Sequence, residues 1–180
     1  MRLSLVRIEL LASSVLLGIA AVWSTARDLE LATAARPALA PLGIGVAAGL
    51  ALAATLPLVT APWARRVLVL RSLRRAWDSL ESGLGPSLRL WEILVLALCS
   101  AVSEEALFRG VLQREVGIAA ASAFFGLLHP LGFVYMLWAA TAGAGLGVLF
   151  AATGSLIAPV AAHATYNLLA LNYLRRRAAR

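Results

Sequence analysis

Long apolar stretches with few charged residues decide what this chain can fold into. A helix that crosses the hydrocarbon core of a bilayer, about 30 Å thick, needs about 20 predominantly apolar residues. Hydrophobic residues make up 61% of the 180 residues and charged residues 14%, whereas a soluble domain is about one quarter charged. We therefore predict an all-α fold, a polytopic membrane helix bundle of about six transmembrane helices. The predicted spans are residues 4–24, 41–61, 88–108, 116–129, 131–152 and 156–174.

The segment 62–87 differs from the six spans because it combines apolar and cationic side chains at helical spacing. This pattern is typical of an amphipathic helix in the headgroup region of a membrane, so we predict one interfacial helix here. A solvated amphipathic connector is the alternative. Gly83, Gly85 and Pro86 are expected to end the helix. Its apolar side consists of Val67, Leu70, Leu73, Ala76, Trp77 and Leu80, and its cationic side of Arg65, Arg66, Arg71, Arg74 and Arg75.

The basic residues predict how the chain is oriented. All 16 are arginines, and the formal net charge is +7. They gather at the N-terminus, in the segment 62–87 and in the tail 175–180, which six spans bring to one side of the membrane. Because cytoplasmic loops carry an excess of basic residues, this side and both termini are expected to be cytoplasmic. The membrane is predicted to be a bacterial inner (plasma) membrane. The arginines cluster between and after the apolar segments, which argues against nucleic-acid binding.

The sequence SEEALFRG places Glu104, Glu105 and Arg109 at the end of the third span. A charged side chain in mid-membrane costs about 2.5–3.5 kcal/mol on insertion scales, so such groups usually face the bundle interior and have a function. Glu105 and Arg109 are four residues apart and can form an intrahelical ion pair. Glu104 points about 100° away from Glu105 and can face a cavity. The alternative is that all three only join helices together.

The two histidines of the chain, His129 and His163, also fall in apolar segments. His129 follows Phe125 by four residues, and Asn167 follows His163 by four residues, so each pair shares a helix face. A single membrane histidine is more often an interhelical hydrogen-bonding group than a catalyst. Together with the glutamates, however, these side chains form a set of polar groups on three predicted helices.

The ordered motifs EExxxR, FxxxH and HxxxN resemble those of the CPBP family, the CAAX-protease and bacteriocin-processing (Abi-like) intramembrane proteases. Each motif is short, but the three occur in order on three predicted helices. The resemblance covers about residues 88–174, which form the predicted catalytic helix bundle. It does not extend to the N-terminal two-span region with its basic connector, residues 1–87, or to the basic cytoplasmic tail, residues 175–180. The motifs stand here as Glu104-Glu105-x-x-x-Arg109, Phe125-x-x-x-His129 and His163-x-x-x-Asn167.

The resemblance implies hydrolysis of a peptide bond inside the bilayer. By the family pattern, Glu104 is the general base that activates a water molecule, and His129 helps to position or activate that water. His163 and Asn167 donate hydrogen bonds to the tetrahedral oxyanion, where one donor is worth about 10²–10³ in rate. The remaining motif residues, Glu105 and Arg109, support the first glutamate.

A zinc mechanism is the alternative to a metal-free one. Glu104, His129 and His163 offer three ligands, and a fourth position could stay open, as in catalytic zinc sites. The motif HExxH is absent, and the single cysteine excludes a multi-cysteine site. The metal-free glutamate mechanism, with no required cofactor, is the favoured prediction.

The expected partners are a membrane-anchored protein or peptide substrate and the lipid bilayer. Glu104 lies about 24 Å along the third span, which predicts a site near the outer face. An outward site suits processing of C-terminal anchors of exported proteins, as in myxosortase-like members of the family, ahead of CAAX-like substrates. The alternatives are a bacteriocin-immunity protein of the same family and a non-catalytic membrane scaffold or transport subunit. The oligomeric state is left open.

Overall fold

The computed structural model describes residues 2–84 and 88–179, and all regular elements within these ranges are helices. This confirms the all-α fold. The elements are α1 (Arg2–Ala26), α2 (Leu31–Ala34), α3 (Leu39–Ala53), α4 (Leu56–Thr60), the 3-10 helix η1 (Pro62–Arg66), α5 (Leu68–Leu84), α6 (Leu90–Leu107), the π-helix η3 (Phe108–Leu112), α7 (Gln113–Leu127), α8 (Phe133–Thr153) and α9 (Ile157–Ala178).

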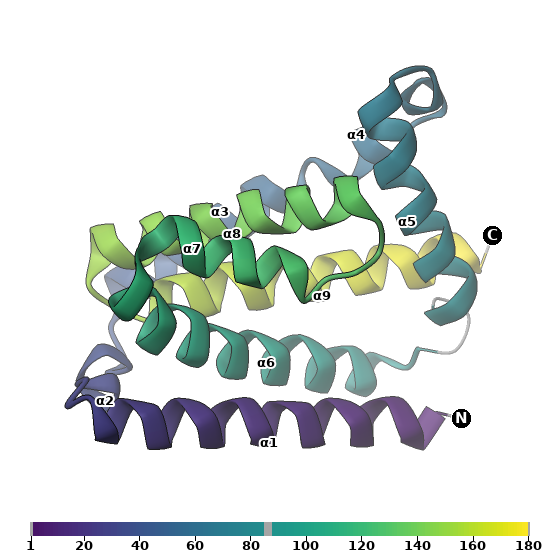
Figure 1. Ribbon diagram of the computed structural model, residues 1–180. Helices are drawn as coiled ribbons and strands as arrows, with labels where there is room; N and C mark the ends of the chain where they lie inside the picture. Colours follow the sequence, from purple (N-terminus) through teal and green to yellow (C-terminus); the bar gives the residue numbers. More distant parts are fainter. Residues whose placement is uncertain (1, 85–87, 180) are drawn as a thin grey trace.

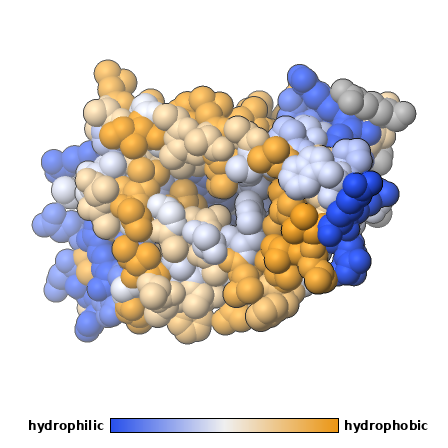
Figure 2. All heavy atoms as spheres, turned by 90° about the horizontal axis from the view of Figure 1, so that it is seen from above, coloured by the Kyte–Doolittle hydropathy of each residue, from blue (hydrophilic) through white to orange (hydrophobic). Residues whose placement is uncertain are grey.

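The long helices run alongside one another in a bundle (Figure 1). Helix α6 packs between α1 and α9, α3 packs on the other side of α9, and α7 pairs with α8. Figure 2 shows an apolar belt between two hydrophilic ends, as expected for a membrane protein. Within the described residues, three stretches are long and apolar enough to cross a membrane: Leu5–Ala26, Leu39–Thr60 and Phe133–Thr153.

The other three predicted spans are also helical, but they carry the polar side chains of the site. Helix α6 contains Glu92, Glu104 and Glu105, and α7 has only 15 residues. The segment predicted as one span at 41–61 is two helices, α3 and α4, separated by residues 54–55.

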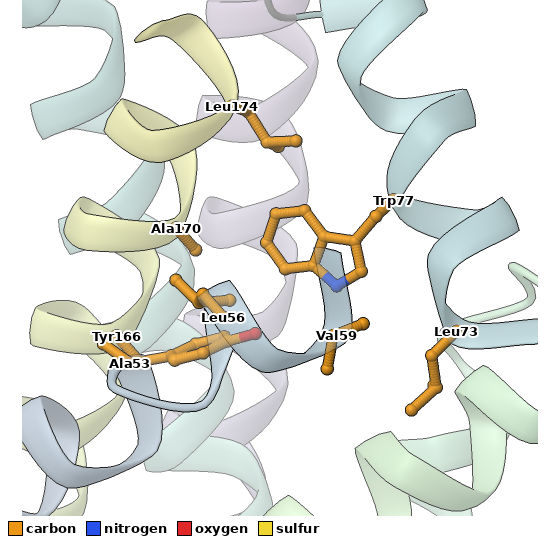
Figure 3. Close-up of a cluster of buried hydrophobic side chains, with 8 residues drawn as sticks. All are labelled: Ala53, Leu56, Val59, Leu73, Trp77, Tyr166, Ala170 and Leu174. Atoms are coloured by element: carbon orange, nitrogen blue, oxygen red, sulfur yellow. The ribbon is translucent and has the colours of Figure 1, made fainter. Parts of the chain in front are cut away.

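Helix α5 lies across one end of the bundle, at the end that also holds the start of α1 and the C-terminus (Figure 1). The three arginine-rich regions thus share one end. The apolar side of α5 contributes Leu73 and Trp77 to a buried cluster with residues of α3, α4 and α9 (Figure 3). Gly83 lies within α5 and does not end it, contrary to the prediction. Gly85 and Pro86 lie outside the described residues.

Arg74 departs from the cationic side predicted for α5. It is buried, and its guanidinium donates hydrogen bonds to the backbone carbonyls of Thr60 and Ala61. Thr60 is the last residue of α4, where the carbonyls of a helix lack an intrahelical partner, whereas the carbonyl of Ala61 also accepts from Ala64 N. Arg71 and Arg75 keep the exposed positions that the sequence predicts.

Glycines set the close packing of α3 against α9, the helix that carries His163. A methyl group at Gly45 would collide with the backbone carbonyl of Ala158, and one at Gly49 with that of Ala162. Small residues four apart let two membrane helices approach closely. This contact fixes the depth at which α9 presents its polar side chains to the bundle interior.

The connection from α6 to α8 differs most from its prediction. Helix α6 runs through the π-helix η3 directly into α7, and Gly117 breaks the helix with a φ of 79°. Helix α7 ends at Leu127, so His129 lies in the non-helical residues 128–132. The prediction of a helix over 116–129 that includes His129 was therefore wrong at its end, where Pro130 cannot continue a helix.

Candidate active site

Glu105 is the centre of a buried ion-pair network. Its side chain is 0% exposed, and its Oε1 accepts hydrogen bonds from Arg109 Nη1 at 3.1 Å and His163 Nδ1 at 2.8 Å. The Glu105–Arg109 ion pair predicted from the four-residue spacing is thus present. A buried charge needs a partner, and here one carboxylate oxygen serves two cationic or polar donors. Oε2 of Glu105 is buried and has no hydrogen-bond partner among the described residues.

Arg109 ties this network to α8. Its Nη2 donates to the backbone carbonyl of Gly143 at 2.8 Å, and its guanidinium lies 4.7 Å from the ring centroid of Phe125. A cation over an aromatic face is stabilised by the quadrupole of the ring. Gly143 has no side chain to displace the arginine, which explains the glycine at this position. Helices α6, α7 and α8 are therefore joined through one guanidinium.

Glu104 differs from its neighbour because its ion-pair contact, with His163, is longer than a hydrogen bond. Its Oε2 is buried and has no partner among the described residues, and it lies 4.0 Å from His163 Nε2. The side chain as a whole keeps 21% exposure. The prediction that Glu104 faces a cavity is not met by the cavity beside His129, His163 and Asn167, because Glu104 does not line it.

His129 reaches the same region although it lies beyond α7. Its Nδ1 is 2.7 Å from the carbonyl oxygen of Phe125, and its ring centroid is 4.6 Å from that of Phe125. A carbonyl oxygen can only accept, so Nδ1 carries the proton and Nε2 of the neutral ring has a free lone pair. Phe125 also lies 6.0 Å from the His163 ring, and thus between the two histidines.

Asn167 makes a contact that the sequence analysis missed. Its Nδ2 donates to Ser100 Oγ at 3.1 Å, and Ser100 Oγ donates to the backbone carbonyl of Ala97 at 3.4 Å. A serine in a membrane helix usually bonds to its own backbone one turn earlier, so its sequence position gave no sign of a second partner. Ser100 precedes Glu104 by four residues and shares its helix face.

Two polar contacts set the register between the antiparallel helices α6 and α9. Glu105 pairs with His163, and Ser100 pairs with Asn167. The residue numbers of each pair add to nearly the same value, as expected for two helices that run in opposite directions. Glu104 therefore lies at the level of His163, in the interval between the two contacts.

A cavity of about 490 Å³ adjoins these groups, between α3 and α8. His129, His163 and Asn167 line it, whereas neither glutamate does. Much of its wall consists of small or apolar residues of α3 and α8. On α8, Thr141, Gly145, Val148 and Ala152 are exposed, and the face seen in Figure 2 is hollowed within the apolar belt. The cavity thus opens sideways, toward the position of lipid.

Three glycines on α8 differ in what surrounds them. Gly143 and Gly147 face close neighbours, the first Arg109 and Phe125, the second Gln113. Gly145, in contrast, lines the cavity, and a methyl group added there would meet no atom within 4 Å. Only two of the three glycines therefore permit a close approach.

The metal ligands predicted for the zinc alternative do not form a ligand set in this structure. Within the described part of the chain, no group of three or more His, Cys, Asp or Glu side chains is arranged to hold a metal ion. His163 Nδ1 is engaged by Glu105, and His129 Nδ1 by Phe125. A metal-binding histidine commonly donates its other ring N–H to a carboxylate or a backbone carbonyl, so these contacts leave Nε2 of each ring for a metal, and the zinc alternative stays a prediction.

Comparison with known proteins gives one family match. Residues 86–169 match the family described as type II CAAX prenyl endopeptidase Rce1-like, which confirms the resemblance to the CPBP family. The uncharacterized protein YpbD of Bacillus subtilis (strain 168) is 38% identical over 77 residues, 39% of this chain and 39% of that protein. The match thus spans well under half of that relative. No solved structure matches. All the predicted site residues lie within the family match.

Proposed function

Because residues 86–169 match the Rce1-like family of type II CAAX prenyl endopeptidases, we propose that the protein is an intramembrane endopeptidase that uses glutamate-activated water. The observation that carries the proposal is the contrast between two adjacent carboxylates. Oε1 of the fully buried Glu105 accepts hydrogen bonds from Arg109 and His163, whereas Glu104 is 21% exposed and its Oε2 comes no closer than 4.0 Å to His163 Nε2. A carboxylate that acts as a base must be free to take a proton.

The reaction begins when water attacks the carbonyl carbon of the scissile peptide bond and Glu104 takes one proton from that water. His129 assists through Nε2, because its Nδ1 is already committed to Phe125. A C–O bond forms, and the carbonyl oxygen becomes an oxyanion. When the C–N bond breaks, the proton held by Glu104 passes to the leaving amine. No metal is needed for this balance of protons.

His163 and Asn167 stabilise the oxyanion. His163 Nδ1 already donates to Glu105, so donation to an oxyanion requires a proton on Nε2 as well. His163 serves in this role only when it carries both protons, and the carboxylates of Glu104 and Glu105 beside it balance that charge. Asn167 has a second Nδ2–H beyond the one that it donates to Ser100.

The cavity supports a substrate that arrives from the membrane. It adjoins His129, His163 and Asn167, and its apolar walls lie between two long helices. A peptide segment in the bilayer can reach it sideways without crossing the headgroup region. We propose a membrane-anchored protein as substrate, with trimming of C-terminal anchors of exported proteins ranked ahead of CAAX-like substrates.

The end of the bundle with α5 and the C-terminus carries most of the arginines, so we propose that it faces the cytoplasm of a bacterial cell. In this orientation the inner (plasma) membrane surrounds the belt of Figure 2. A bacteriocin-immunity role within the same family is an alternative, as is a non-catalytic scaffold or transport subunit. The unpaired Glu104 favours the protease.

The test compares the termini of membrane proteins in cells that make either the native chain or Glu104→Gln at matched abundance. Defined cleavage products that disappear in the variant would support the protease and identify its substrates. Unchanged termini, under conditions in which deletion of the native gene has a phenotype, would refute it. The scaffold or transport role would then explain the polar residues.

A further inference from the structure

We propose that Ser100 is a positioning residue of the active site, which orients the carboxamide of Asn167 for its contact with the oxyanion. This inference rests on the proposed function and adds a residue that lies outside the three family motifs. Ser100 is half-buried on α6, one helical turn before Glu104. It is the described side chain that Asn167 contacts through a hydrogen bond.

The hydrogen bonds of Ser100 select one orientation of the amide. A serine hydroxyl has one proton, and Ser100 directs it to the carbonyl oxygen of Ala97 at 3.4 Å. The lone pairs of Oγ then face Asn167, and in the structure the amide turns Nδ2 toward Ser100, at 3.1 Å. One Nδ2–H is used in this contact, and the second is left for another acceptor.

Ser100 lies one helical turn before the proposed general base, Glu104, and contacts the proposed oxyanion donor, Asn167. Ser100 and Glu104 share a face of α6, and Asn167 and His163 share a face of α9. The pairs Ser100–Asn167 and Glu105–His163 flank Glu104 along the helices. One helix thus carries the base and also sets the orientation of an oxyanion donor, and Asn167 lines the cavity where the substrate is proposed to bind.

Without the hydroxyl, the carboxamide of Asn167 loses the partner that distinguishes its two ends. It can then turn by half a rotation and present Oδ1, an acceptor, to a developing negative charge. Substrate binding does not depend on this choice, because the oxyanion exists only after attack. The expected defect therefore falls on kcat and not on KM.

The experiment uses the full chain in lipid vesicles, with a precursor identified from the Glu104→Gln comparison. Loss of an oxyanion donor costs about 10²–10³ in kcat, so loss of its orientation by Ser100→Ala is expected to lower kcat by about 10–100-fold. KM should stay within about twofold, and Ser100→Thr, which keeps the hydroxyl, should restore most of kcat.

Ser103→Ala is the matched control. Ser103 lies on the same helix, is fully buried, donates to the carbonyl of Cys99 at 2.8 Å and contacts Ser13 of α1 at 3.1 Å. It thus has the same kind of interhelical hydrogen bond, but toward α1. We expect its kcat to stay within about twofold of the native value, because the contact does not touch an oxyanion donor.

A double substitution shows whether Ser100 acts through Asn167. In the background of Asn167→Ala, Ser100→Ala should cause almost no further fall in kcat, because the side chain that it orients is gone. A full additional loss in that background would overturn the proposal, as would native kcat in Ser100→Ala. If either result occurs while Glu104→Gln is inactive, only the role of Ser100 fails. If Glu104→Gln cleaves at the native rate, the proposed function fails as well.

Discussion

The same substitution in the two adjacent glutamates of α6 should lower the free energy of unfolding by very different amounts. Glu104→Gln and Glu105→Gln each remove one negative charge and keep the shape of the side chain. They differ in what the lost charge was balancing. Glu105 holds Arg109 and His163, whereas Oε2 of Glu104 has no partner among the described residues. The effect on stability should follow from this difference alone.

The magnitude follows from burial. The Glu105 and Arg109 side chains are 0% and 2% exposed, so Glu105→Gln leaves a guanidinium in the bundle interior without its counter-charge. Removal of one partner of a buried ion pair costs about 3–5 kcal/mol. Glu104 is 21% exposed and lies 4.0 Å from His163 Nε2, beyond hydrogen-bond distance, and Glu105 stays beside that ring, so Glu104→Gln should change the free energy of unfolding by less than about 1 kcal/mol.

The assay is reversible unfolding of the purified variants in mixed micelles, followed by helical circular dichroism. It needs no substrate and is independent of the proposed chemistry. The expected order of stability is native, then Glu104→Gln close behind it, and Glu105→Gln far below. Equal destabilisation by the two substitutions, or a larger loss for Glu104→Gln, would refute the division between a structural and a free carboxylate.

Three further predictions concern the cavity, the packing of α9 and the metal. Gly145→Leu should fill the cavity and abolish cleavage while the protein stays folded. The control is Gly18→Leu on α1, where a methyl group also meets open space, and it should leave cleavage intact. Equal activity of both variants in the vesicle assay would argue against this cavity as the substrate site. Gly49→Ala should lower the free energy of unfolding by about 1–3 kcal/mol, because its methyl group meets the backbone carbonyl of Ala162. A native-like denaturation midpoint would show that α3 and α9 do not pack this closely. Dialysis against a chelator should leave cleavage unchanged, while a loss that zinc restores would support the zinc alternative.

Residue spacing predicted the parts of the site that lie within one helix. Glu105 and Arg109 are four apart and form their ion pair at 3.1 Å, as expected for neighbours on a helix face. Spacing says nothing about contacts between helices. The bond of His163 to Glu105 and that of Asn167 to Ser100 depend on the register of α6 against α9, which no local pattern encodes.

The predicted fourth span is helical up to Leu127, and its end was misplaced. Apolar composition alone placed His129 at the end of a helix, but α7 ends two residues earlier and is broken again at Gly117. The π-helix η3 shifts the residues after Leu107 relative to an α-helix, and Gly110 in its sequence FRGVL does not by itself predict a π-turn. These irregular turns, together with the ring contacts of Phe125, bring His129 toward His163.

Arg74, at the end of the bundle that holds α5, also makes contacts that the sequence pattern did not predict. Its place among five arginines predicted a headgroup contact, yet its guanidinium turns inward to the carbonyls of Thr60 and Ala61. The carbonyl of Thr60 needs a donor because α4 ends at this residue, and the helical pattern of α5 cannot reveal it.

Glutamate-dependent hydrolysis is tested most directly with purified protein in vesicles that contain one precursor, in water enriched in ¹⁸O. The native protein should release a fragment whose new carboxyl terminus carries ¹⁸O, and Glu104→Gln, inserted to the same level and equally stable, should release none. Unlabelled termini, or labelled fragments formed equally well by Glu104→Gln, would contradict a water molecule activated by Glu104.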